Sequence, residues 1–184
     1  MDKGEKIMSS KCERILDSIR LNAGEDIYKK IVEVYGELPL KSSPTKQAKY
    51  VKSILNELEN NIGKNIVEKV MKPCGHLCIS NRTIKEAKKL FERAENVEKF
   101  LDLMNEKHIG GGELHMDSGN IIGIYNKCYC GMAKNVENMP ASYCNCSAGW
   151  FEKLFSSVFN KTVKVTKLQT ILEGADKCVF KIEF

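Results

Sequence analysis

The chain has 184 residues and a formal net charge of +5, and its composition is 42% hydrophobic and 29% charged. This balance is typical of a folded domain with a full core and excludes an intrinsically disordered chain. No apolar run approaches the roughly 20 residues of a membrane helix, so we expect no membrane partner. The lysines alternate with glutamates instead of forming one basic block, which disfavours nucleic acid as a partner.

Residues 43–71 carry the clearest helical pattern of the first half. Apolar side chains recur there at steps of three and four, which places them on one stripe of a helix. Ser43 is a suitable N-cap, and Gly63 is a point at which one helix would give way to two. Shorter helices are expected upstream. The sequence therefore predicts a helical preface over residues 1–42 and a domain over residues 43–184, together one compact unit.

The second half predicts one further long helix and then a change to strands. A capping box begins this helix at Thr83, and its apolar face continues to Gly110–Gly112. Residues 113–125 and residues 162–184 predict two hairpins, and an apolar helix with Ser147 as its N-cap lies between them. The order of helices, hairpin, helix and hairpin predicts an α+β fold, with N-terminal helices packed on a twisted antiparallel sheet.

Cysteine spacing is the most unusual feature of the chain. Six of the eight cysteines form three close pairs, Cys74/Cys78, Cys128/Cys130 and Cys144/Cys146. The charged amino terminus carries no secretory signal, which predicts a cytoplasmic protein. In that reducing compartment, close cysteine pairs indicate metal ligands or redox thiols more than permanent disulfides. Unpaired thiols and functional disulfides remain the alternatives.

The second and third pairs predict one metal site. Cys128 and Cys130 end a strand just before Gly131, where a turn would let both thiolates face one ion. Cys144 and Cys146 stand before a helix, whose exposed backbone amides favour thiolate over thiol. Four thiolates from these turns predict a tetrahedral zinc site, with an iron–sulfur cluster as the alternative cofactor.

A second metal or redox site is predicted at Cys74, His76 and Cys78. If Pro73 opens a helix, the two cysteines lie on one helical face with the histidine between them in sequence. An irregular joint with half-buried thiols is the alternative. Cys178 alternates onto an apolar strand face, which predicts a core residue, but the start of its strand would also let it reach a site at the end of the sheet.

The carboxy-terminal block resembles the 4-vinyl reductase-like domain. The resemblance rests on Cys144-Asn145-Cys146-Ser147-Ala148-Gly149-Trp150 and Gly174-Ala175-Asp176-Lys177-Cys178-Val179-Phe180. Together with the Cys-Gly-His-x-Cys, Gly-Gly-Gly and Cys-x-Cys-Gly motifs before them, these segments are similar to an uncharacterised bacterial and archaeal family of that superfamily. The family pattern has glycine and aspartate adjacent, whereas Ala175 separates them here, so we expect a terminal hairpin that is one residue longer.

This resemblance implies a fold shared with the Golgi-transport and nitric-oxide-signalling ligand-binding domains, in which helices and an antiparallel sheet surround an apolar pocket. Some relatives hold zinc through cysteines of the turn and the terminal hairpin. Cys144, Cys146 and Cys178 match those positions, and Cys128 and Cys130 are additional donors.

We therefore expect a small-molecule-binding or sensor module with a cysteine-coordinated metal, most simply zinc. A pocket behind Trp150 and Phe151 would receive a small apolar or mixed ligand. The alternative is a small-molecule hydrolase, because a related group includes an aminothiazoline-carboxylate hydrolase. Such an enzyme would use a metal-bound water or a cysteine thiolate, and no catalytic residue is assigned. The sequence leaves a homodimer open.

Overall fold

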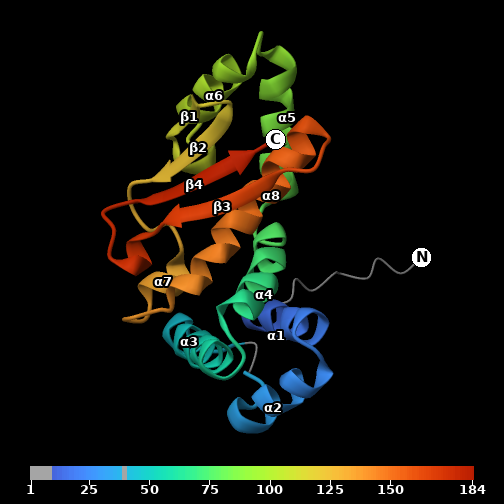
Figure 1. The fold of residues 1–184 in the computed structure, drawn as a ribbon, viewed down its shortest axis with the longest axis vertical. Coiled ribbons are helices and arrows are strands. Elements are labelled where there is room, and N and C mark those ends of the chain that lie inside the picture. Colours follow the sequence, from blue (N-terminus) through green and yellow to red (C-terminus); the bar gives the residue numbers. More distant parts are fainter. Residues whose placement is uncertain (1–9, 39–40) are drawn as a thin grey trace, which may run out of the picture.

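The computed structural model describes residues 10–38 and 41–184 (Figure 1). Within them the protein has the predicted α+β fold, with helices packed against a four-stranded antiparallel sheet. The charged segment Met1–Lys6, from which a cytoplasmic location was predicted, lies outside the described residues. In the described part of the chain, no helix combines the length and the apolar character needed to cross a membrane.

The first four helices of the described chain are α1 (Lys11–Asn22), α2 (Glu25–Tyr35), α3 (Pro44–Asn61) and α4 (Lys64–His76). Ser43 caps α3 as predicted, because its hydroxyl accepts a hydrogen bond from the Lys46 amide. Gly63, at a φ of 113°, separates α3 from α4, so the predicted break is confirmed. Helices α1, α3 and α4 share one apolar core. The domain boundary between residues 42 and 43 stays a prediction.

The long helix predicted from Thr83 is two helices, α5 (Asn81–Arg93) and α6 (Val97–Glu106). Its predicted start is wrong, because Ser80 is the N-cap and accepts a hydrogen bond from the Thr83 amide. The prediction of one continuous helix is also wrong. The Asn96 side chain accepts a hydrogen bond from the Lys99 amide and so begins α6 as a new helix.

Both predicted hairpins are present, and they share one sheet. The elements are η1 (Ile109–Gly111), β1 (Leu114–Asp117), β2 (Asn120–Tyr125), β3 (Lys164–Gln169), η3 (Ile171–Glu173) and β4 (Cys178–Glu183). The strand order is β1-β2-β4-β3, so the last strand lies between β2 of the first hairpin and its own partner β3. Antiparallel pairing between β2 and β4 thereby joins the two hairpins.

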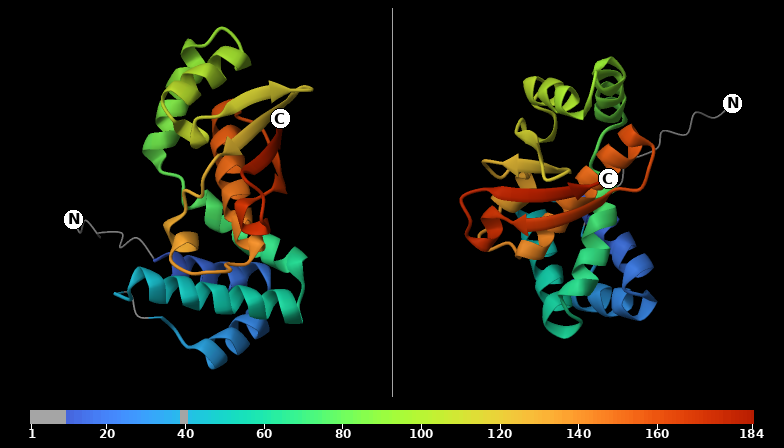
Figure 2. Two further views of the ribbon diagram at one scale, coloured as in Figure 1. Left: turned by 90° about the vertical axis from the view of Figure 1, so that its left-hand side faces the viewer. Right: turned by 45° about the horizontal axis from the view of Figure 1, so that its top comes forward.

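The segment between the hairpins contains α7 (Gly131–Lys134), η2 (Ala141–Cys144) and α8 (Asn145–Phe159). Ser147 is not the N-cap of α8, because the helix begins two residues earlier and places Ser147 in its first turn. Helix α8 contributes the fully buried Phe151 and Phe155 to the core beneath the sheet. It also runs alongside α4, and the views in Figure 2 show α1–α3 at one end of the molecule and the sheet with α5 and α6 at the other.

Two glycines let α4 and α8 meet through their backbones. A Cβ on Gly75 would overlap the carbonyl oxygen of Cys146 and lie 2.7 Å from the Trp150 amide nitrogen. A Cβ on Gly149 would overlap the carbonyl oxygen of Lys72. Any larger residue would therefore push the helices apart. We call this contact the α4–α8 crossing, and it lies where the helical core meets the core beneath the sheet.

Candidate functional site

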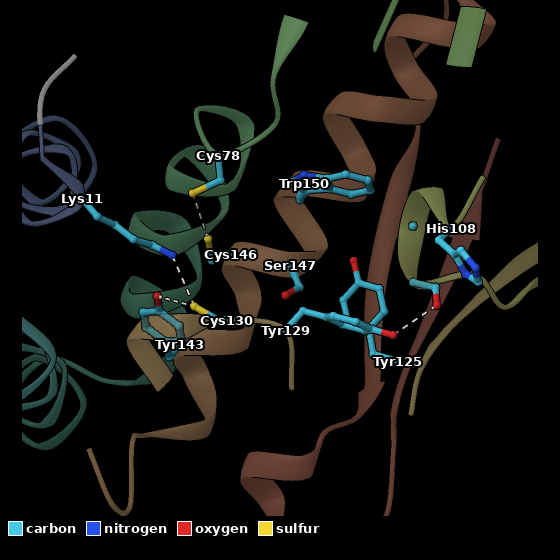
Figure 3. A pocket seen from close by; sticks show the side chains of 12 residues that line it. Lys11, Cys78, His108, Tyr125, Tyr129, Cys130, Tyr143, Cys146, Ser147 and Trp150 are labelled. Carbon is cyan, nitrogen blue, oxygen red and sulfur yellow. Dashed lines mark hydrogen bonds between the residues drawn. The ribbon is translucent and has the colours of Figure 1, made fainter. Parts of the chain in front are cut away.

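A cavity of about 370 Å³ lies beside the α4–α8 crossing and is lined by α1, η1, β2, η2, α8, the turn after α4 and the loop that follows β2 (Figure 3). Its aromatic side consists of Tyr125, Tyr129 and Trp150. Its polar side consists of Lys11, Cys78, Cys130, Tyr143 and Cys146. Figure 3 shows these two groups facing each other across the cavity.

The aromatic side is held in place by ring contacts and one hydrogen bond. Tyr125, the last residue of β2, stacks on Phe151 with ring centroids 5.3 Å apart. Tyr129 packs edge-on against Tyr125, with ring centroids 5.4 Å apart. The Tyr129 hydroxyl donates a hydrogen bond of 3.3 Å to the Gly111 carbonyl. Trp150 also packs edge-on against Phe151. Of the two predicted pocket residues, Trp150 therefore lines the cavity, while Phe151 lies fully buried behind it.

Cys78 and Cys146 place their sulfurs 3.8 Å apart on the polar side. Cys146 lies in the first turn of α8 and is buried, whereas Cys78 lies in the turn after α4 and is exposed. The Cys146 thiol donates a hydrogen bond to Cys78, which lowers the pKa of Cys78 to about 6 with help from the charges of Lys11 and Arg14. The same hydrogen bond and burial raise the pKa of Cys146 well above its usual value.

Lys11 connects Cys130 to this pair. Its ammonium group donates a hydrogen bond of 3.6 Å to the Cys130 sulfur and lies 5.1 Å from the centre of the Tyr143 ring. The Tyr143 hydroxyl is 3.1 Å from the same sulfur. Burial alone would raise the pKa of Cys130, but Lys11 and Tyr143 outweigh it and leave this pKa lowered. Burial likewise opposes the charge on Lys11, and the neighbouring cysteines offset it, so the Lys11 pKa is raised.

Cys128, Cys144 and Cys178 lie outside the cavity lining. Cys178 begins β4, and its sulfur accepts a hydrogen bond of 3.4 Å from the Ile171 amide of η3. The Cys178 side chain belongs to the core beneath the sheet, as predicted by the alternation. Burial raises the pKa of Cys144 to about 12 and also raises that of Cys178. These two thiols are therefore held as neutral core groups.

The five cysteines of the predicted zinc site are thus divided between two places. Cys130 and Cys146 face the cavity, and Cys128, Cys144 and Cys178 do not line it. Within residues 10–38 and 41–184, no three His, Cys, Asp or Glu side chains are arranged as ligands of one metal ion. The zinc site and its iron–sulfur alternative therefore stay predictions.

The three residues of the second predicted site have different partners. Pro73 lies inside α4 and does not open a helix, contrary to the expectation. Cys74 is buried and donates to a carbonyl of its own helix, while His76 Nε2 lies 3.4 Å from Glu152 Oε2 on α8. Only Cys78 reaches the cavity.

The sequence did not point to Lys11, Tyr125, Tyr129 or Tyr143 as cavity residues. Tyr143 directly precedes Cys144 in the sequence, and Tyr129 lies between the cysteines of the second pair, so aromatic residues beside cysteine pairs were an available signal. Lys11 carried no comparable signal, because it is 119 residues from its partner Cys130 and resembles many other helical lysines.

The chain belongs to a family of unknown function, DUF6144, whose model matches residues 5–184. No curated protein matches the chain. Among solved structures, it is similar to the phenol-responsive sensory domain of the transcription activator PoxR with phenol, at 14% identity and a TM-score of 0.42. That match covers 80% of this chain and 77% of the other.

A second solved structure, described as "Modulating Heme Redox Potential Through Protein-Induced Porphyrin Distortion", matches at 14% identity with a TM-score of 0.41. It covers 93% of this chain and 96% of the other. At these scores neither likeness assigns a ligand to this chain. The resemblance to the 4-vinyl reductase-like domain stays a prediction.

Proposed function

We propose that the protein is a small-molecule-binding or sensor module and that its ligand occupies the cavity beside the α4–α8 crossing. The observation that supports this proposal is one cavity with two chemically different sides. Its volume of about 370 Å³ falls within the range of small-molecule sites, about 300 to 1,000 Å³. Aromatic lining with a few convergent polar groups is the usual composition of such sites.

The two sides favour a mixed ligand with a flat apolar body. An aromatic ring would pack against Tyr125, Tyr129 and Trp150, where ring contacts are favourable. The polar end would then reach Lys11 and Cys78. Because the Cys78 thiolate offsets the Lys11 ammonium at neutral pH, this end of the cavity favours a neutral hydrogen-bonding group over an anion.

Trp150 is the only tryptophan, so its fluorescence reports directly on the cavity. We would titrate reduced protein with benzyl alcohol and benzoate, which share a ring and differ in charge. Benzyl alcohol is expected to change the Trp150 emission in a saturable way and to bind more tightly than benzoate. Millimolar affinity is the expected scale for fragments of about eight heavy atoms.

A ligand-observed NMR measurement would test the same site without the reporter. Trp150→Leu should weaken benzyl alcohol binding, whereas Tyr35→Leu should leave it unchanged, because Tyr35 lies on α2 and does not line the cavity. If neither fragment gives saturable binding by either method, the proposed ligand class is wrong.

Metal binding is a second proposal, and it rests on the three close cysteine pairs of the sequence. Metal analysis and an absorption spectrum of anaerobically purified protein test it. About one zinc per colourless chain would support a thiolate zinc site, and visible charge-transfer bands would support an iron–sulfur cluster. Metal-free protein would contradict both the zinc site and the iron–sulfur cluster. The hydrolase alternative would then depend on Cys78 as the nucleophile.

A further inference from the structure

Cys78 and Cys146 come from distant parts of the chain, 68 residues apart, yet their sulfurs are 3.8 Å from each other. A disulfide needs a sulfur–sulfur distance of about 2.05 Å, so the sulfurs must approach by less than about 2 Å. The pair combines an exposed partner, Cys78, with a buried one, Cys146. An oxidant can therefore reach the first sulfur without opening the core.

The backbone around the pair fixes one sulfur and leaves the other adjustable. Cys146 lies in the first turn of α8, and its carbonyl oxygen is held against Gly75 in the α4–α8 crossing. Cys78 lies beyond the last turn of α4, where its amide donates a hydrogen bond of 3.0 Å to the Gly75 carbonyl. Its neighbour Leu77 is 60% exposed, so the turn can adjust without moving this side chain out of a core.

We propose that Cys78 and Cys146 form a reversible dithiol–disulfide site, in which Cys78 reacts first with a hydroperoxide and Cys146 resolves the product. The proposal does not depend on the identity or presence of a cavity ligand. This dithiol site also differs from the close cysteine pairs of the sequence, because Cys78 belongs to the pair Cys74/Cys78 and Cys146 belongs to the pair Cys144/Cys146.

The chemistry balances with a hydroperoxide as the oxidant. The Cys78 thiolate attacks the terminal oxygen of ROOH, the O–O bond breaks, and the departing alkoxide takes a proton to become ROH. Cys78 is then a sulfenic acid. Cys146 gives up its proton and attacks the Cys78 sulfur, the S–S bond forms, and the S–O bond breaks with release of water. In total, two thiols and ROOH give a disulfide, ROH and H₂O.

Exposure and the direction of the hydrogen bond assign these two roles. Cys78 is the exposed sulfur and accepts the hydrogen bond from Cys146, which favours the thiolate of Cys78, the form that attacks peroxide. Cys146 is buried and donates this hydrogen bond, so it carries its proton until Cys78 has been oxidised. The exposed cysteine is thus the attacking group, and the buried cysteine is the resolving one.

Neighbouring cysteines are less suited to compete. Cys74 is 1% exposed, donates to the Val70 carbonyl at 3.3 Å, and has its pKa raised by burial to about 11. Cys130 is less exposed than Cys78, and its sulfur contacts the Tyr143 hydroxyl and the Lys11 ammonium instead of a second thiol. The expected product is therefore one specific link between the α4 turn and α8.

The test is peptide mapping of reduced, metal-free full-length protein after brief treatment with tert-butyl hydroperoxide and alkylation of the remaining thiols. We expect the intact chain to lose two hydrogen atoms and a Cys78–Cys146 peptide to be the main linked product. Dithiothreitol should reverse the change. A main link that joins either cysteine to a different partner, or no intramolecular link, would overturn the proposal. The experiment uses wild-type protein without a cavity ligand, so its outcome is independent of the proposed ligand binding.

Two variants test the roles. Cys146→Ser should stop at the sulfenic acid of Cys78, which dimedone traps, and should form no internal disulfide. Cys78→Ser should lose both products, while Cys12→Ser, which changes a buried thiol on α1, should behave as wild type. Oxidation of the Cys78→Ser variant at the wild-type rate would contradict the assignment of Cys78 as the attacking thiol. Circular dichroism would verify that each variant is folded.

Discussion

The α4–α8 crossing predicts an unusual response to the substitution Gly75→Ala. In an ordinary helix interior, alanine is more favourable than glycine by about 1 kcal/mol, so this substitution would stabilise the protein. At this position, the new methyl group would overlap the Cys146 carbonyl oxygen and lie 2.7 Å from the Trp150 amide nitrogen. Ordinary contacts need about 3.5 Å, so the two helices would have to separate by roughly 1.5 Å to relieve the overlap with the Cys146 carbonyl oxygen.

Overpacking of this kind costs about 1 to 3 kcal/mol, and rigid backbone on the facing helix places this case at the upper end. After subtraction of the helix-propensity gain, we expect the free energy of unfolding to fall by about 2 kcal/mol. For a chain of this length, that corresponds to a melting temperature lower by about 4 to 8 °C.

Urea denaturation followed by circular dichroism measures this change. Gly131→Ala is the matched control, because Gly131 begins α7, has no positive φ, and would place its Cβ in open space. The control should match or slightly exceed the wild-type stability. If Gly75→Ala is as stable as wild type, the backbone contact between the helices is wrong. The variant should also form the Cys78–Cys146 disulfide more slowly.

Two further predictions follow from shifted pKa values. Alkylation of Cys78 by iodoacetamide should reach half its maximal rate near pH 6. Cys12 should stay unreactive at neutral pH, because burial raises its pKa to about 11. A Cys78 midpoint near pH 9 would refute this prediction. Burial alone would raise the pKa of Glu152, but hydrogen bonds from His76 and Lys72 leave this pKa lowered. The Glu152 carboxylate therefore stabilises the fold at pH values above its unfolded-state pKa of about 4.3. This stabilisation is lost as the pH falls through the folded-state pKa. Glu152→Gln should therefore be less stable than wild type at pH 7, with the difference shrinking below about pH 4 in thermal melts; a difference that is constant with pH would contradict it.

The elements that the sequence predicted well depend on local physics. Alternating side chains define the two hairpins, and Gly63 breaks the helical pattern because its positive φ cannot continue a helix. The α5 start was misplaced because Ser80 and Thr83 lie within one turn and both can cap. In the structure the Ser80 hydroxyl accepts from the Thr83 amide, so the serine begins the helix. Spacing alone does not decide between two adjacent caps.

The candidate site was harder to predict because it depends on how two helices cross. Sequence proximity grouped Cys78 with Cys74 and Cys146 with Cys144, whereas the structure turns Cys78 towards Cys146 and buries the other two. The crossing depends on Gly75, and a glycine in a helical segment does not by itself reveal which backbone it will meet. Long-range pairs of this kind need tertiary geometry.

The crossing also connects the two proposals through charge. Both sulfurs of the dithiol line the cavity, and at neutral pH the Cys78 thiolate offsets the Lys11 ammonium. Disulfide formation removes that thiolate, so the polar side of the cavity becomes more positive and anionic ligands gain relative to neutral ones. By thermodynamic reciprocity, a ligand that binds the oxidised form more tightly stabilises the disulfide by the same factor. A ligand that needs the thiolate protects the reduced pair instead, so the charge of the ligand sets the direction of the coupling.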